Sequence, residues 1–118
     1  MWVSLVRIAA LLCFLAVGFG AFGAHALKHT LEANGLMDAW KTAVLYHFLH
    51  AIALLVLALV GAGPRAVWWL LFSGIIVFSG SLYAIGLTNI HWLGAITPIG
   101  GLLFFAGWLW LAIAPRRS

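Results

Sequence analysis

Residues 42–64 read TAVLYHFLHAIALLVLALVGAGP and contain no Asp, Glu, Lys or Arg. A helix of about 20 apolar residues crosses a bilayer, because each residue adds about 1.5 Å across a hydrocarbon core about 30 Å thick. A charge at the centre of such a helix costs roughly 2.5–3.5 kcal/mol on insertion scales. An uncharged run of this length therefore predicts a membrane span.

Three further runs have the same character. They are Ile8–Ala24 (lengthened by Trp2–Val6), Ala66–Leu87 and Trp92–Ala114. Charged residues make up only 7% of the chain, against roughly 25% in a typical soluble domain, so they cannot coat a water-exposed surface. The sequence predicts an all-α membrane protein, a bundle of four transmembrane helices in a single domain 1–118. The expected spans are 3–24, 42–63, 66–87 and 92–114.

The basic residues fall near the ends of these spans, as topology signals do, so the net charge of +4 does not indicate nucleic-acid binding. One side of the membrane receives Arg7, Arg65, Arg116 and Arg117, and the other receives Lys28 and Lys41. The positive-inside rule then predicts a multi-pass protein with both termini in the cytoplasm. Most of the seven tryptophans lie near predicted span ends, where their amphipathic rings favour the headgroup level.

The longest break between spans covers residues 25–41. We expect a short helical extension over His25–Ala33, ended at Asn34-Gly35 by a left-handed C-cap. Asp38 is expected to cap the next helix and Trp40 to lie at the headgroup level.

The N-terminal run permits a second interpretation, because Arg7, an apolar stretch and Ala24-His25-Ala26 imitate a cleavable signal peptide. The run is long for that purpose, which favours an uncleaved span. The single Cys13 gives no disulfide framework within one chain. Residues 15–27 (LAVGFGAFGAHAL) faintly resemble residues 75–87 (IIVFSGSLYAIGL), so two parallel hairpin repeats are one explanation and chance is the other.

Polar side chains inside the predicted spans, or directly at the end of one, gather in the half away from the cytoplasm, and Ser73 is the exception in the other half. The gathered residues are His25, His47, His50, Ser79, Tyr83 and Thr97. His47 and His50 are three positions apart and share a helix face. One interpretation is that these groups join helices together, because polar atoms in hydrocarbon need partners. The other is a small pocket in which the histidines act as ligands or proton carriers.

Catalytic or cofactor chemistry finds less support. His25/His29 and His47/His50 have spacings that can chelate, but no Cys, Asp or Glu joins them within the membrane, and no metal or cofactor is predicted. A haem would need two facing histidines, such as His25 and His50. Pro98 near the start of the last span, followed by two glycines, predicts close packing or a bend.

Four ordered motifs carry a family resemblance. They are GAFGAHAL (20–27), WKTAVLYHFLHA (40–51), FSGSLY (78–83) and GAITPIGG (94–101). With them the chain resembles the YgdD-type family of small bacterial inner-membrane proteins, a domain of unknown function with eukaryotic four-span relatives. The resemblance implies four helices and a location in the bacterial inner membrane, and it implies no activity.

Three functional hypotheses remain. The first is a non-enzymatic scaffold, or a protein that binds a small ligand, membrane lipid or another membrane protein. The second is an oligomeric carrier of a small solute or ion, oligomeric because so short a four-span chain encloses little space. The third is a protein with a metal or haem held by histidines.

Overall fold

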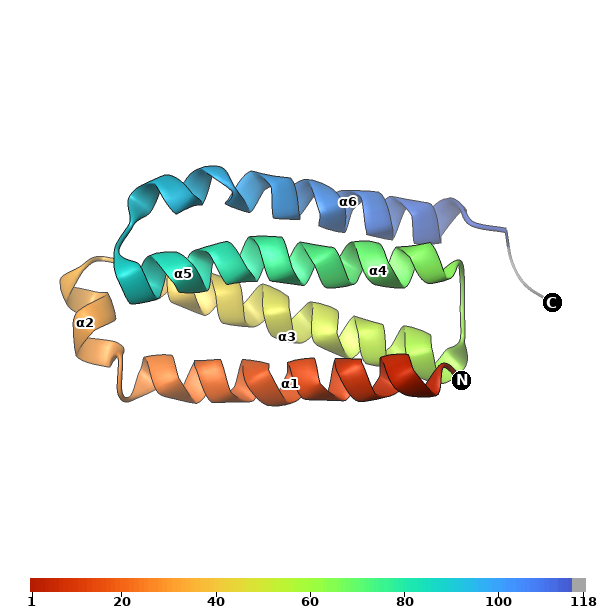
Figure 1. Ribbon diagram of the computed structural model, residues 1–118, viewed down its shortest axis with the longest axis horizontal. Helices are drawn as coiled ribbons and strands as arrows, with labels where there is room; N and C mark the ends of the chain where they lie inside the picture. The colour runs from red at the N-terminus through yellow and green to blue at the C-terminus, as the bar shows by residue number, and fades with distance from the viewer. Residues whose placement is uncertain (116–118) are drawn as a thin grey trace.

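The computed structural model describes residues 1–115, which are helical almost throughout (Figure 1). The first span is α1 (Val3–Ala24) and the second is α3 (Met37–Val60). The third span joins α4 (Arg65–Gly74), the π-helix η1 (Ile75–Ser79) and α5 (Gly80–Thr88), and the fourth joins the 3-10 helix η2 (His91–Ala95) to α6 (Thr97–Ile113). Between the first two spans lies α2 (Lys28–Ala33). All four spans are long and apolar enough to cross a membrane, and the described residues form no strand. The predicted all-α membrane bundle is confirmed.

Helix α3 begins earlier than the apolar run, at Met37 instead of residue 42. A helix can continue beyond the hydrocarbon as long as its backbone hydrogen bonds form. The charged residue Lys41 bounds the apolar run and does not mark the start of the helix. The predicted cap was wrong: Leu36 occupies the N-cap without a side-chain bond, and Asp38 lies in the first turn. There its negative carboxylate interacts favourably with the positive end of the helix dipole. The predicted left-handed Gly35 is present, with φ of 68°.

The four spans form two antiparallel hairpins. Helix α1 packs along α3, and the third span packs along α6, with α3 also contacting the third span (Figure 1). The first and third spans run in the same direction, so the two hairpins are parallel to one another. Common ancestry of the two hairpins stays a prediction. We refer below to the "α2 end" of the bundle and to the opposite "N-terminal end".

The fourth span approaches the backbone of the third closely at the π-helix. A Cβ atom placed on Gly100 would meet the backbone of Phe78, whereas one placed on the adjacent Gly101 would meet nothing within 4 Å. Pro98 lies in the first turn of α6, where no helix bond is lost. The close packing expected here is confirmed, and it depends on Gly100.

Two tryptophans that the sequence places at the headgroup level are buried inside the bundle. Trp40 is 2% exposed and Trp68 is fully buried. The Trp68 indole N–H donates to the carbonyl oxygen of Leu54 at 3.0 Å. A neighbouring helix supplies the hydrogen-bond acceptor and the apolar surroundings of each ring. The level of these rings in the membrane stays a prediction.

We predict that Gly100→Ala lowers the stability of the bundle by about 1–3 kcal/mol, because the new methyl meets backbone that cannot rotate away. Gly101→Ala is the matched control. It adds the same methyl in open space to the same helix, and we expect no loss of stability. Thermal unfolding of both variants in detergent measures the difference, and equal unfolding temperatures would contradict the close approach.

Candidate functional site

The first candidate site is a buried pair of side chains joining α3 to α5. His47 Nδ1 and the Tyr83 hydroxyl share a hydrogen bond of 2.8 Å, and either group can be the donor. His47 is 3% exposed, and its Nε2 atom has no hydrogen-bond partner within residues 1–115. The two rings meet edge to face, with centroids 5.8 Å apart. The pair fixes the rotation of α5 relative to α3.

Two buried donors near this pair find carbonyl oxygens on neighbouring helices. The Ser79 hydroxyl, in the π-helix, donates to Ala43 of α3 at 2.8 Å. The Trp40 indole N–H donates to Phe19 of α1 at 3.0 Å. A carbonyl oxygen has two lone pairs, so it can accept such a bond in addition to its own helix bond.

The fourth span is joined by a pair of hydroxyl groups. Thr97, at the start of α6, lies 2.6 Å from the hydroxyl of Ser81 in α5. Ser81 also donates to the carbonyl oxygen of Phe78 at 2.9 Å. Thr97 is among the six polar residues singled out in the sequence, and Ser81 is not. The string Ser79-Gly80-Ser81 was the only available signal.

His50 lies apart from these groups, farther along α3. Its Nδ1–H donates to the carbonyl oxygen of Tyr46 at 2.8 Å, and its Nε2 accepts from the Trp108 indole at 2.9 Å. The ring also stacks on Phe104, with centroids 3.7 Å apart and planes 15° apart. Both ring nitrogens are therefore occupied by the protein. Trp108 and Phe104 were not singled out from the sequence.

His25 does not join the interior groups. It is exposed at the C-cap of α1, where its backbone N–H bonds to Ala21. Of the six polar residues singled out in the sequence, five lie inside the bundle, but in separate pairs and not around a common space. These contacts support the interpretation that they join helices, and a ligand-binding role for them stays a prediction.

The geometry offers little to a metal ion or haem. Within the part of the chain that the structure describes, no group of three His, Cys, Asp or Glu side chains is placed to hold a metal ion. His50 lies about 20 Å along α3 from Met37, whereas His25 is at the α2 end, so the two do not face each other across one ring. His50 would also have to give up a hydrogen bond to act as a ligand.

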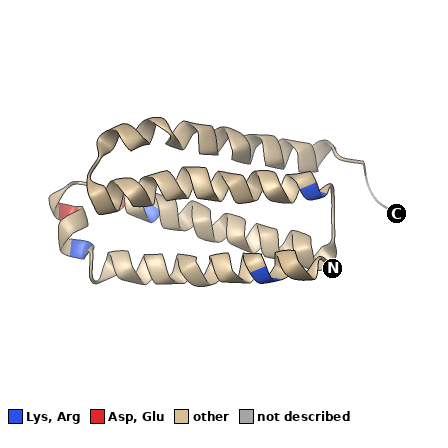
Figure 2. Cartoon of the chain, in the orientation of Figure 1, with Lys and Arg blue, Asp and Glu red and all other residues tan. Residues whose placement is uncertain are grey.

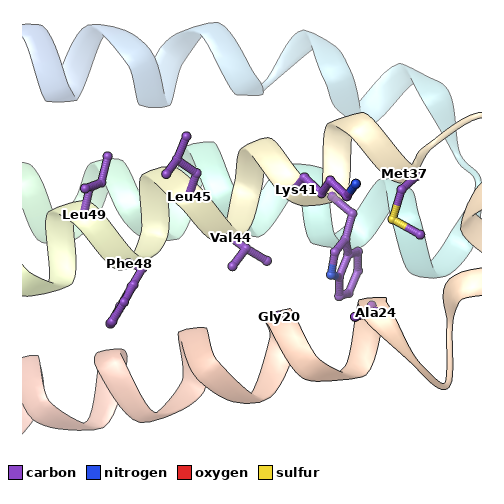
Figure 3. A pocket seen from close by; sticks show the side chains of 10 residues that line it. Gly20, Ala24, Met37, Lys41, Val44, Leu45, Phe48 and Leu49 are labelled. Atoms are coloured by element: carbon purple, nitrogen blue, oxygen red, sulfur yellow. The ribbon is translucent and has the colours of Figure 1, made fainter.

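The second candidate site is a pocket of about 350 Å³ between α1 and α3, which we call the α1–α3 pocket (Figure 3). It is lined by Gly20, Gly23, Ala24, Met37, Trp40, Lys41, Val44, Leu45, Phe48 and Leu49. Lys41 is the only charged residue among them. From Lys41 to Leu49 the pocket follows α3 for about 12 Å. Met37 lines it about one turn nearer the α2 end than Lys41. The pocket is therefore an apolar channel along the bundle surface with a cation near its α2 end.

The shape of this pocket depends on Trp40 and the glycines around it. A Cβ atom on Gly23 of α1 or on Gly86 of α5 would meet the Trp40 indole. The ring fills the space between these helices and forms the inner wall at the α2 end. Beyond it, Gly20 offers no side chain of its own, and its nearest neighbour across the gap is Val44.

Comparison with known proteins shows the family of this chain. The family model described as "Protein of unknown function (DUF423)" matches residues 19–101. The chain belongs to this family. A UPF0382 membrane protein of Staphylococcus epidermidis is 49% identical over 117 residues, covering 95% of this chain and 94% of its own length. The UPF0382 membrane protein YwdK of Bacillus subtilis is 43% identical, covering 92% and 93%. No solved structure matches the chain.

We predict that His47→Leu lowers stability by about 1–3 kcal/mol, because the Tyr83 hydroxyl is left unpaired in the interior. Tyr83→Phe should also destabilise, and the double variant should show a coupling of about 0.6 kcal/mol, the usual size for such bonds in membranes. His25→Leu is the control, because this exposed residue should leave unfolding in detergent unchanged. Independent, additive effects of the two substitutions would contradict the helix-joining role of the pair.

Proposed function

We propose that this member of the DUF423 family is a non-enzymatic membrane protein that binds a phospholipid in the α1–α3 pocket. The acyl chain would lie along Val44, Leu45 and Phe48, and the phosphate would lie at the Lys41 ammonium. The observation that supports this most is the combination of an apolar channel of about 350 Å³ with a single cation at one end. This matches the polarity of a lipid, whose charged group and hydrocarbon tail lie at opposite ends.

The place of the pocket along α3 supports this arrangement. Lys41 lies four residues after the start of α3, about 6 Å along the helix, where we expect headgroups to meet hydrocarbon. The pocket then continues toward the bilayer centre, as an acyl chain does. A lysine is a common phosphate ligand in proteins, and its long stem can reach outward to the headgroup.

We infer that both termini lie in the cytoplasm and that the pocket faces the outer leaflet of a bacterial inner membrane, the location that the YgdD-type resemblance implies. Figure 2 shows Arg7 and Arg65 toward the N-terminal end and both lysines at the α2 end. Arg116 and Arg117, which complete the count in favour of this orientation, lie outside the described residues. The excess of arginine favours the N-terminal end as the cytoplasmic one.

The other hypotheses have no comparable observation in their favour. A carrier needs polar groups along its whole path, but the N-terminal half of the bundle interior is filled by side chains such as Trp68, Leu54 and Leu71, all fully buried. A path between the subunits of an oligomer would require a second copy of the chain, and the structure describes one. The histidines are separated and partly engaged in hydrogen bonds, as described above.

The lipid proposal is tested by filling the pocket. Ala24 lines the pocket and is exposed, so Ala24→Phe places a ring in the channel without disturbing the core. After purification in mild detergent, we expect this variant to carry about one third or less of the phospholipid that the native chain carries. Native mass spectrometry measures the bound lipid. A threefold change corresponds to loss of a contact of about 0.65 kcal/mol.

Ala21→Phe is the matched control, because Ala21 is exposed on the same helix but does not line the pocket. It should retain lipid as the native chain does. If neither the native chain nor the control retains phospholipid, or if both phenylalanine variants retain as much as the native chain, the proposed binding site is wrong.

Orientation is tested separately, by cysteine labelling in whole cells with a reagent that does not cross membranes. In a Cys13→Ser background, Asn34→Cys in the turn after α2 should be labelled, and Ala66→Cys beside Arg65 should not. Both positions are exposed in the structure. The reverse pattern would place the pocket in the cytoplasmic leaflet.

A further inference from the structure

The α1–α3 pocket has a second charge beside its mouth, and it is negative. Asp38 precedes Lys41 by three positions, so the two side chains are neighbours on the surface of α3. Asp38 also lies seven residues before Leu45 and eleven before Leu49, close to two and three full turns of about 3.6 residues. It therefore lies on the edge of α3 that carries Leu45 and Leu49, directly after the lining residue Met37 and beside the α2 end of the pocket.

Both charged side chains are available to a ligand. Asp38 and Lys41 are exposed. Within residues 1–115, neither side chain takes part in a hydrogen bond. A carboxylate and an ammonium thus lie next to each other on α3 near the α2 end of the apolar channel, where the headgroup is proposed to lie.

The whole α2 end is electrically balanced. Figure 2 shows both acids, Glu32 and Asp38, and both lysines, Lys28 and Lys41, gathered there. Two positive and two negative charges cancel, so this end exerts no net attraction on an anionic headgroup. In contrast, the described charges toward the N-terminal end, Arg7 and Arg65, are all positive.

We propose that the α1–α3 pocket selects a zwitterionic phospholipid with a free amine, of the phosphatidylethanolamine class. Its phosphate lies at Lys41 and its ammonium donates to the carboxylate of Asp38. The two-carbon linker between phosphate and amine in this headgroup suits two side chains that are neighbours on one helix face. An anionic lipid such as phosphatidylglycerol offers the same phosphate, but it gives Asp38 a hydroxyl in place of a cation.

This inference rests on the proposed lipid-binding function, and its test separates the two. The full-length protein in mild detergent is mixed with equal amounts of phosphatidylethanolamine and phosphatidylglycerol that carry identical acyl chains. Native mass spectrometry then gives the ratio of the two bound lipids. We expect the native chain to favour phosphatidylethanolamine by about threefold or more, the scale of a solvent-exposed ion pair.

Substitutions test whether the preference for phosphatidylethanolamine depends on the charges of Asp38 and Lys41. Asp38→Asn should bring the ratio close to one by weakening phosphatidylethanolamine, whereas Lys41→Gln should weaken both lipids because both carry the phosphate. Glu32→Gln is the matched control, because it removes the other acid of the same end from α2, outside the pocket lining, and should leave the ratio unchanged.

The outcomes are distinct. Equal binding of the two lipids by the native chain, a preference for phosphatidylglycerol, or a ratio unaffected by Asp38→Asn would overturn the headgroup inference and leave the lipid site standing. Loss of the preference in Glu32→Gln as well as in Asp38→Asn would also overturn it, because the preference would then follow total charge. Absence of both lipids from the native chain would overturn the proposed function itself.

Discussion

Hydrocarbon offers no water to a polar side chain, so the polar side chains of this bundle must bond to other parts of the protein. Most of these bonds involve helix α3. Within residues 1–115, six side-chain hydrogen bonds join one span to another, and five of them end on α3. Each contributes little, about 0.6 kcal/mol in comparable membrane proteins. Their distribution matters more than their strength, since they fix α1, the third span and the fourth span against the same helix. The sixth bond, Ser81 to Thr97, joins the third and fourth spans directly.

Van der Waals contact supplies the rest of the cohesion, since lipid tails are as apolar as the side chains they would replace. The bundle achieves this contact by placing large rings opposite glycines. Trp40 lies against Gly23 and Gly86, and Phe104 lies against Gly74. The Trp40 ring thus has two roles: it fills the space between the glycines of α1 and α5, and it lines the α1–α3 pocket.

Composition was sufficient to predict the solvent, the number of spans and the helical class, because these depend on runs of about 20 residues and tolerate local errors. Single side chains were harder to place. Trp40 and Trp68 lie near span ends in the sequence, and nothing there says whether such a ring faces headgroups or a neighbouring helix. The glycines that receive Trp40 are 17 residues before it and 46 after it, and only the packing brings them together. The grouping of His25 with the interior polar residues was wrong for a different reason. His25 is the C-cap of α1, where the chain leaves the helix, and the residue is exposed.

The π-helix at Ile75–Ser79 had no signal in the sequence, yet it divides the third span into parts with different neighbours. On one side, α4 belongs to the buried cluster around Trp68, Leu54 and Leu71, and on the other, α5 contributes Tyr83 and Ile85 to the cluster around Trp40. Single π-helical turns inside α-helices often occur at functional sites. The third span therefore changes its neighbours at the same place where its backbone hydrogen-bond pattern changes.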